Sequence, residues 1–215
     1  MNTKNLVAEF IGTFALIFIG AGALAITEAN LVGVALAHGL VIVTFAYAYG
    51  HISGTHINPV VTLGLLIAGE IEFVAAIGYW IVQFLGGILG AVVLNTVLPN
   101  PGDLGVTILA EGVTPVQGLV VEIVLTFFLV NTIFNTAVSG KAGNFAGLAI
   151  GLTLVLCILM GGPLTRASLN PARTLGPATV SGNYADLWLY FVGPCVGAIL
   201  AALLYIGVLK DKEEA

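Results

Sequence analysis

Two short turns hold the residues best able to contact a small polar molecule. Residues 56–64 read "HINPVVTLG" and residues 168–176 read "SLNPARTLG". Asn58 and Asn170 each precede a proline, and the second turn adds the guanidinium of Arg173. Asn is a strong helix N-cap and Pro is favoured at the first helical position, so each turn predicts the start of a helix.

The composition places these turns in a membrane protein. The chain has 215 residues, of which 59% are hydrophobic and 8% are charged, and its mean hydropathy is +1.09. A soluble domain needs far more polar surface than this. A helix needs about 20 apolar residues to cross a hydrocarbon core of roughly 30 Å. The sequence therefore predicts an all-α membrane protein with six transmembrane helices, at 6–26, 31–49, 73–98, two between 116 and 160, and 188–209.

The lysines predict how these spans are oriented, because basic residues favour the cytoplasmic side. They occur near the N-terminus, in the loop after the fourth span and near the C-terminus, at Lys4, Lys141, Lys210 and Lys212. The opposite loops carry the acidic residues Glu28, Asp103 and Glu111. We therefore expect the N- and C-termini to be cytoplasmic.

The two turns belong to an internal repeat. The segment "AEFIGTFALIF" at 8–18 aligns with "VEIVLTFFLVN" at 121–131, which pairs Glu9 with Glu122. Four such matches occur in the same order, at offsets of 111 to 114 residues. Each repeat, approximately 1–100 and 114–215, holds three spans, so the second copy must enter the membrane from the opposite side. This pattern predicts an inverted repeat within a single domain, residues 1–215.

The repeat explains why the Asn-Pro turn occurs twice. The apolar stretches Asn58–Ala68 and Asn170–Val180 can each form a helix of about 15 Å, half a bilayer. Inverted symmetry brings these half-helices together at their N-termini, where each contributes about half a positive charge. Such broken helices survive in a membrane only where they line a watery cavity or are buried in protein. That midpoint suits a neutral hydrogen-bonding solute and repels a cation.

At this point the chain resembles an aquaporin, a member of the major intrinsic protein family. The resemblance rests on "AEFIGTF", "GHISGTHINPVVTLG", "SLNPARTLGPA" and "WLYFVGP". It implies a homotetramer in the lipid bilayer, with one passive pore per subunit, no cofactor and no enzymatic activity. The first motif departs from the family pattern, because Val60 stands where Ala is usual. The implied pore motifs are Asn58, Pro59 and Val60 in the first turn and Asn170, Pro171 and Ala172 in the second.

The resemblance also implies a selectivity filter. By motif its members are His38, Ile158, Ala167 and Arg173, a set similar to that of tonoplast intrinsic proteins. Arg173 supplies permanent charge and several donors, whereas Ile158 replaces the polar wall found in strict water channels. The alternative for His38 is a core histidine whose hydrogen bonds are satisfied by its neighbours.

Other polar residues are assigned in the same way. The carboxylates of Glu9 and Glu122 are expected to accept hydrogen bonds from the loops that carry the half-helices, with proton coupling as the alternative. His56 is expected to line the pore, and His51 to pack within a loop. Arg166 is expected to point outward, toward Asp103 or Glu111, rather than to act as a second filter arginine.

The function implied by the resemblance is passive conduction of water, together with ammonia and other small neutral solutes, and exclusion of protons and ions. The chain has no basic run that would suggest nucleic-acid binding, and no metal-ligand cluster or nucleophile–base set. Two alternatives stay open. One is a glycerol or urea facilitator of the same family, and the other is an ion-coupled secondary transporter, since such transporters also use inverted repeats and broken helices.

Overall fold

The apolar segments form helices in a computed structural model that describes residues 2–26, 30–100 and 102–210. Glu28 and Lys212, which entered the prediction of orientation, lie outside the described residues. Within them, six helices are long and apolar enough to cross a membrane. These helices span Thr3–Ala25, Leu31–Ser53, Phe73–Val97, Pro115–Val138, Gly143–Thr165 and Leu189–Leu209. The predicted number of spans is therefore confirmed.

Several spans contain short irregular turns at an end or in the middle. The first combines α1 (Thr3–Ala15), the π-helical turn η1 (Leu16–Ala21) and α2 (Gly22–Ala25). The next two long helices are α3 (Leu31–Ser53) and α5 (Phe73–Val97). The second half contains α6 (Pro115–Ile133) with η2 (Phe134–Val138), η3 (Gly143–Phe145) with α7 (Ala146–Thr165), and α9 (Leu189–Leu204) with η4 (Tyr205–Leu209).

The two Asn-Pro turns begin short helices, as predicted. Helix α4 covers Pro59–Ile67 and α8 covers Pro171–Ser181. The side-chain oxygen of Asn58 accepts the N–H of Val60 at 3.0 Å, and that of Asn170 accepts the N–H of Ala172 at 3.0 Å. Each asparagine thus satisfies a backbone donor that the first turn of a helix leaves free.

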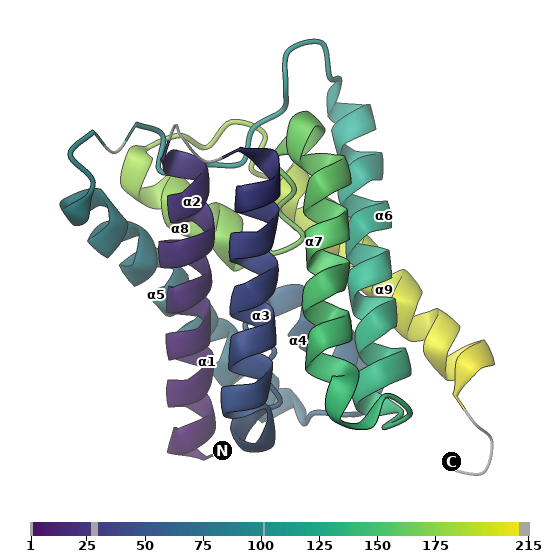
Figure 1. Cartoon of the computed structure of the whole chain (residues 1–215). Coiled ribbons are helices and arrows are strands. Elements are labelled where there is room, and N and C mark those ends of the chain that lie inside the picture. Colours follow the sequence, from purple (N-terminus) through teal and green to yellow (C-terminus); the bar gives the residue numbers. More distant parts are fainter. Residues whose placement is uncertain (1, 27–29, 101, 211–215) are drawn as a thin grey trace.

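The helices of the two halves pack in matching pairs (Figure 1). In the first half α1 packs against α5 and α3, and in the second half α6 packs against α9 and α7. Each half-helix crosses over, because α4 packs against α9 and α8 packs against α5. This exchange is the arrangement that two inverted repeats produce, and it brings α4 and α8 into contact inside the bundle.

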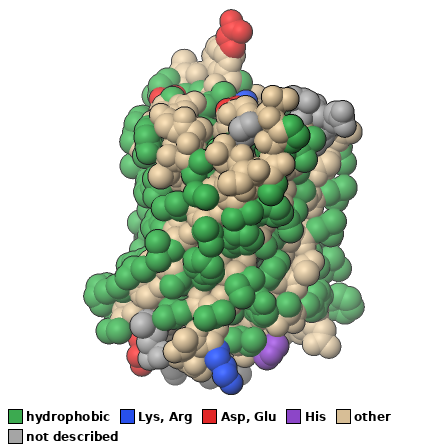
Figure 2. Space-filling view, turned by 90° about the vertical axis from the view of Figure 1, so that its left-hand side faces the viewer, with side chains coloured by type: hydrophobic (Ala, Val, Ile, Leu, Met, Phe, Trp, Pro, Cys, Tyr) green, Lys and Arg blue, Asp and Glu red, His purple; other side chains and the backbone are tan. Residues whose placement is uncertain are grey.

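The outer surface separates an apolar middle from charged ends. Figure 2 shows hydrophobic side chains across the middle of one face, with charged side chains toward its upper and lower limits. The two chain ends and the 139–145 loop share one end of the molecule (Figure 1), and at this end Lys210 lies 3.7 Å from Glu70. The loop that carries Asp103 and Glu111 lies at the opposite end. This distribution is typical of a helix bundle that spans a bilayer.

Helices α3 and α7 cross closely because both present glycine at the contact. A Cβ added to Gly39 would lie 2.6 Å from the carbonyl oxygen of Gly151, and one added to Gly151 would lie 2.6 Å from that of Gly39. Real Cβ atoms do not approach oxygen so closely, so any larger residue must push the helices apart. Membrane helices pack through such small residues because lipid supplies little hydrophobic drive between them.

We predict that Gly39→Ala destabilises the bundle by about 1–3 kcal/mol, the usual cost of overpacking. Gly50→Ala is the matched control, because it lies on the same helix and its added Cβ would meet nothing within 4 Å. Thermal unfolding of the detergent-solubilised protein would measure both variants. Equal melting temperatures for the two variants would show that the α3–α7 contact tolerates an extra methyl group.

Candidate functional site

The two asparagine side chains are held by reciprocal hydrogen bonds between the repeats. The Nδ2 of Asn58 donates to the carbonyl of Leu169 at 2.9 Å, and the Nδ2 of Asn170 donates to the carbonyl of Ile57 at 3.0 Å. Both asparagines are buried. An amide nitrogen carries two hydrogens, so each Asn retains one N–H beyond the bond that orients it.

The segments that lead into the half-helices adopt backbone conformations that L-residues rarely use. Thr55 and Ile57 have φ values of 52° and 39°, and Ala167 and Leu169 have 45° and 53°. These are equivalent positions of the two repeats. Each non-glycine residue in the left-handed region costs on the order of 1–3 kcal/mol, so surrounding contacts must stabilise both segments.

Glu9 supplies those contacts in the first repeat, where its carboxylate is fully buried. One oxygen accepts the backbone N–H of His56 at 2.9 Å and the hydroxyl of Ser53 at 2.7 Å. The other accepts the N–H of Ile57 at 2.6 Å and the Nε2 of Gln83 at 2.9 Å. The carboxylate thereby holds two successive backbone donors of the strained segment.

Glu122 makes the equivalent contacts in the second repeat and is also fully buried. Its carboxylate accepts the N–H groups of Ser168 at 2.9 Å and Leu169 at 2.8 Å, and the hydroxyl of Thr165 at 2.7 Å. All of these partners are donors, and an ionised carboxylate only accepts. The two glutamates therefore serve the same local geometry in opposite halves.

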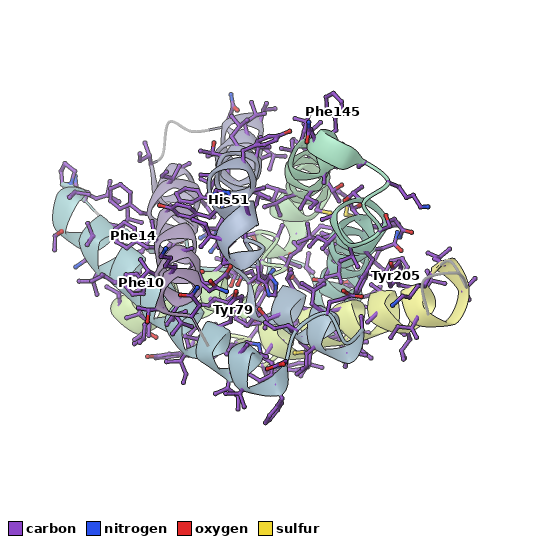
Figure 3. All side chains as sticks on the ribbon, turned by 90° about the horizontal axis from the view of Figure 1, so that it is seen from below. Phe10, Phe14, His51, Tyr79, Phe145 and Tyr205 are labelled. Atoms are coloured by element: carbon purple, nitrogen blue, oxygen red, sulfur yellow. The ribbon has the colours of Figure 1, made fainter. Side chains whose placement is uncertain are left out.

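Two tyrosines, which the sequence analysis did not assign to the site, complete this symmetry. Tyr79 donates its hydroxyl to the carbonyl of Ser53 at 2.8 Å, and Tyr190 donates to the carbonyl of Thr165 at 3.0 Å. In the view from below, Tyr79 points toward the middle of the bundle, whereas Phe145 lies at its edge (Figure 3). The internal repeat could have found them, because "YWIVQFLGG" at 79–87 aligns with "YFVGPCVGA" at 190–198 and pairs Tyr79 with Tyr190.

A cavity of about 590 Å³ runs into the protein from the end that carries the termini. Its mouth includes His51, which lies exposed in the last turn of α3. The expectation that His51 packs within a loop is therefore wrong, because α3 continues past the predicted end at Tyr49 and stops only at Gly54. Deeper in, the cavity is lined by His56, Asn58, Asn170, His38 and Arg173.

His56 lines the cavity before the asparagines. Its Nδ1 lies 3.0 Å from the hydroxyl of Thr62, and its ring packs edge-on against Tyr79 with centroids 4.9 Å apart. Gln83 in turn donates to the same Thr62 hydroxyl at 3.0 Å and to Glu9. The imidazole is thus fixed through the same network that holds the first strained segment.

His38 and Arg173 lie at the inner end of the cavity and retain polar atoms without a protein partner. The Nδ1 of His38 lies 2.9 Å from the carbonyl of Val34, and the Nη1 of Arg173 donates to the carbonyl of Gly105 at 2.6 Å. Among the described residues, His38 Nε2, Arg173 Nε and Arg173 Nη2 have no hydrogen-bond partner. Buried polar atoms are normally paired, so the lack of a protein partner sets these three atoms apart from most buried polar groups. The alternative of a fully satisfied core histidine does not describe His38.

The other two predicted filter residues do not line this cavity. Ile158 and Ala167 are each 1% exposed and belong to the apolar core that includes Leu125 and Leu169. Cys157, beside Ile158, points its thiol at the carbonyl of Leu125 at 3.5 Å. The cavity thus brings together His38 and Arg173, whereas Ile158 and Ala167 belong to the apolar core.

Arg166 is turned away from the cavity. Its Nη1 pairs with the carboxylate of Asp103 and donates to the carbonyl of Val106 at 2.9 Å. The expected outward orientation toward Asp103 or Glu111 is confirmed for Asp103. In the part of the chain that the structure describes, no group of three or more His, Cys, Asp or Glu side chains could hold a metal ion.

Comparison with known proteins gives one family match and several similar proteins. The family model described as "Major intrinsic protein" matches residues 1–205. "Probable aquaporin TIP2-2" of Oryza sativa subsp. japonica is 42% identical over 99% of this chain and 90% of its own length. "Nodulin-26" of Glycine max is 41% identical over 94% of this chain and 76% of its own length.

The fold is shared with a solved structure. The X-ray structure of the aquaglyceroporin from Plasmodium falciparum has a TM-score of 0.82 and covers 97% of both chains, at 24% sequence identity. The family match over nearly the whole sequence, the two relatives above 40% identity and the common architecture all agree. This chain belongs to the major intrinsic protein family.

Proposed function

We propose that the protein is a passive channel for water that excludes protons and ions. One observation carries this proposal: the two Asn side chains, each capping a half-helix, line a single cavity that opens at one end and reaches His38 and Arg173. Several of the relatives are named aquaporins, which favours water as the solute. The solute path continues from the cavity past His38 and Arg173 to the opposite face.

The asparagine pair accounts for selection of neutral solutes. Asn58 and Asn170 each offer one N–H to the lumen, and a water oxygen can accept from both in turn. The positive ends of α4 and α8 meet at the same place, so a cation there faces repulsion. The nearby carboxylates of Glu9 and Glu122 already accept hydrogen bonds from the backbone of the loops. Water that accepts at both asparagines has its own hydrogens directed away from the midpoint, which interrupts a proton-conducting chain.

The constriction is assigned to His38, Ile158, Ala167 and Arg173. His38 Nε2, Arg173 Nε and Arg173 Nη2 replace contacts that a solute loses on leaving bulk water. Ile158 and Ala167 form the apolar and small sides of the path beyond the inner end of the cavity. An apolar side lowers the penalty for a solute with fewer hydrogen bonds than water, so ammonia is proposed as a second permeant.

The buried carboxylates support the structure rather than carry protons. Glu9 accepts four hydrogen bonds and Glu122 accepts three, all from groups that belong to the loops or to neighbouring helices. A carboxylate that shuttled protons would have to release these donors in each cycle. This argues against the ion-coupled transporter. The bulk of His38 argues against glycerol as the main solute.

The remaining features of the proposal concern the membrane. We place both termini on the cytoplasmic side, because Lys4, Lys141 and Lys210 share that end of the bundle. The apolar outer faces of the helices contact lipid and, in a homotetramer, neighbouring subunits.

Stopped-flow permeability of proteoliposomes to water, ammonia, urea and glycerol tests the solute range directly. Water flux no faster than that of protein-free liposomes would contradict the channel.

Ion exclusion is the first prediction of this mechanism. Proteoliposomes should swell rapidly in an osmotic gradient while an imposed pH gradient decays no faster than in empty liposomes. The reason is that Asn58, Asn170 and the two helix ends oppose any positive charge at the midpoint. A pH-sensitive dye enclosed in the same vesicles measures both properties. Decay of the pH gradient that scales with protein content would show that protons pass.

Ammonia permeation depends on Ile158. Replacing it by histidine adds a hydrogen-bonding wall, and an unmatched polar contact costs roughly 1–3 kcal/mol. We expect Ile158→His to lower the ratio of ammonia flux to water flux by at least about fivefold, the rate equivalent of 1 kcal/mol. Ile158→Val, which keeps an apolar wall, is the control and should preserve the ratio. An equal fall in both fluxes, or no ammonia flux in the parent, contradicts the assignment.

The support role of Glu122 predicts a loss of stability on neutralisation. In Glu122→Gln the amide NH₂ group would face backbone N–H donors, and hydrogen bonds to a charged group contribute about 1.5–3 kcal/mol each. We expect the free energy of unfolding to fall by roughly 3 kcal/mol and water flux to be largely lost. Glu111→Gln, at an exposed position, is the matched control. Unchanged melting and flux in Glu122→Gln would remove this role.

A further inference from the structure

In the loop between α5 and α6, residues 104–107 form a buried strap at the end of the pore opposite the termini. Leu104, Val106 and Thr107 are each 1% exposed, although they lie in a connecting segment without helix or strand. The hydroxyl of Thr107 lies 2.9 Å from that of Thr174, one residue after Arg173. The loop therefore packs directly onto the start of α8.

Within this strap, consecutive carbonyls accept the two arginines of the second turn. Gly105 accepts Arg173 Nη1 at 2.6 Å, and Val106 accepts Arg166 Nη1 at 2.9 Å. Asp103 joins the two contacts. One of its carboxylate oxygens pairs with Arg166, and the other accepts the N–H of Gly105 at 3.0 Å.

Gly105 is fixed from its other side as well. Its φ is 69°, and a Cβ at this position would collide with the carbonyl of Ala21 in η1. The peptide that holds Arg173 is thus wedged between the first span and the Asp103 side chain. Loss of the Asp103 contact would leave it supported on one side only.

The charges make Asp103 necessary in a second way. Arg166 and Arg173 are like charges whose guanidinium groups bind adjacent carbonyls, and they repel each other. Asp103 offsets this repulsion at the Arg166 side. The Arg166 and Asp103 side chains are 28% and 40% exposed, so their pairing adds little to global stability. The pairing acts locally, because it fixes the positions of the Gly105 carbonyl and of the two guanidinium groups.

We infer that Arg166 and Asp103 are positioning residues for Arg173. By fixing the strap, they hold the Gly105 carbonyl where it accepts Arg173 Nη1, and this contact keeps the Arg173 guanidinium against the wall of the passage. This inference rests on the proposed channel. Without the pair, Arg173 Nη1 loses its acceptor and turns to other polar atoms at the inner end of the cavity, among them His38 Nε2. That movement narrows the passage and lowers water flux.

Three variants test the effect of the pair. Arg166→Gln and Asp103→Asn remove one charge each, and Arg166→Lys keeps it. Among the described residues, both hydrogen bonds of the Arg166 side chain come from the single atom Nη1, so one lysine ammonium can replace them. We expect water permeability per channel to fall about fivefold in the two neutral variants, the equivalent of about 1 kcal/mol, and to stay within about twofold of the parent in Arg166→Lys. Size-exclusion chromatography confirms that equal amounts of folded protein are compared.

A double-mutant cycle separates positioning from a merely structural role. In an Arg173→Val background, Arg166→Gln should cause no further change in water permeability, because the residue it positions is gone. An equal fold-change in both backgrounds overturns the inference, as does unchanged permeability of Arg166→Gln in the otherwise native protein. If the parent itself conducts no faster than lipid, the channel proposal fails first, and that result is visible before any variant is measured.

Discussion

Two buried carboxylates stabilise the backbone segments that lead into the half-helices, which would not keep their conformation without this support. Glu9 and Glu122 accept N–H groups from segments in which several residues take left-handed conformations. Those conformations direct the carbonyls of Ile57 and Leu169 at the opposite asparagines. In a membrane interior, a backbone donor without an acceptor is costly. The carboxylates therefore stabilise the break in each half, and the half-helices depend on them.

The asparagines link the two halves at that break. Each one caps its own helix through its oxygen and contacts the other repeat through its nitrogen. Because these bonds are reciprocal, neither half-helix can shift without losing two contacts. The same bonds leave one N–H of each asparagine unused, in a cavity that already contains two positive helix ends. In the proposed channel, rigidity and selectivity thus arise from the same side chains.

The opposite end of the pore is built differently, because its support comes from a loop rather than from a repeated motif. Among the described residues, the guanidinium of Arg173 has a single protein acceptor, the carbonyl of Gly105, and its other two nitrogens have no partner. A guanidinium held at one point can present its other donors to a solute. Because the guanidinium has one acceptor, its position depends on the strap, and we infer that Arg166 and Asp103 fix the strap.

The sequence alone determined the six spans, the half-helix starts and the pairing of Glu9 with Glu122, since hydropathy, helix capping and internal repetition are properties of local segments. Its failure at His51 was also local, because a hydropathy pattern does not mark where a polar helix end stops. Only the tertiary structure decided that Asp103 rather than Glu111 pairs with Arg166, and that Gly105 receives Arg173. It also placed Ile158 and Ala167 in the core beside the cavity. Such contacts join residues more than 60 positions apart through a loop without periodicity, so no spacing in the sequence encodes them.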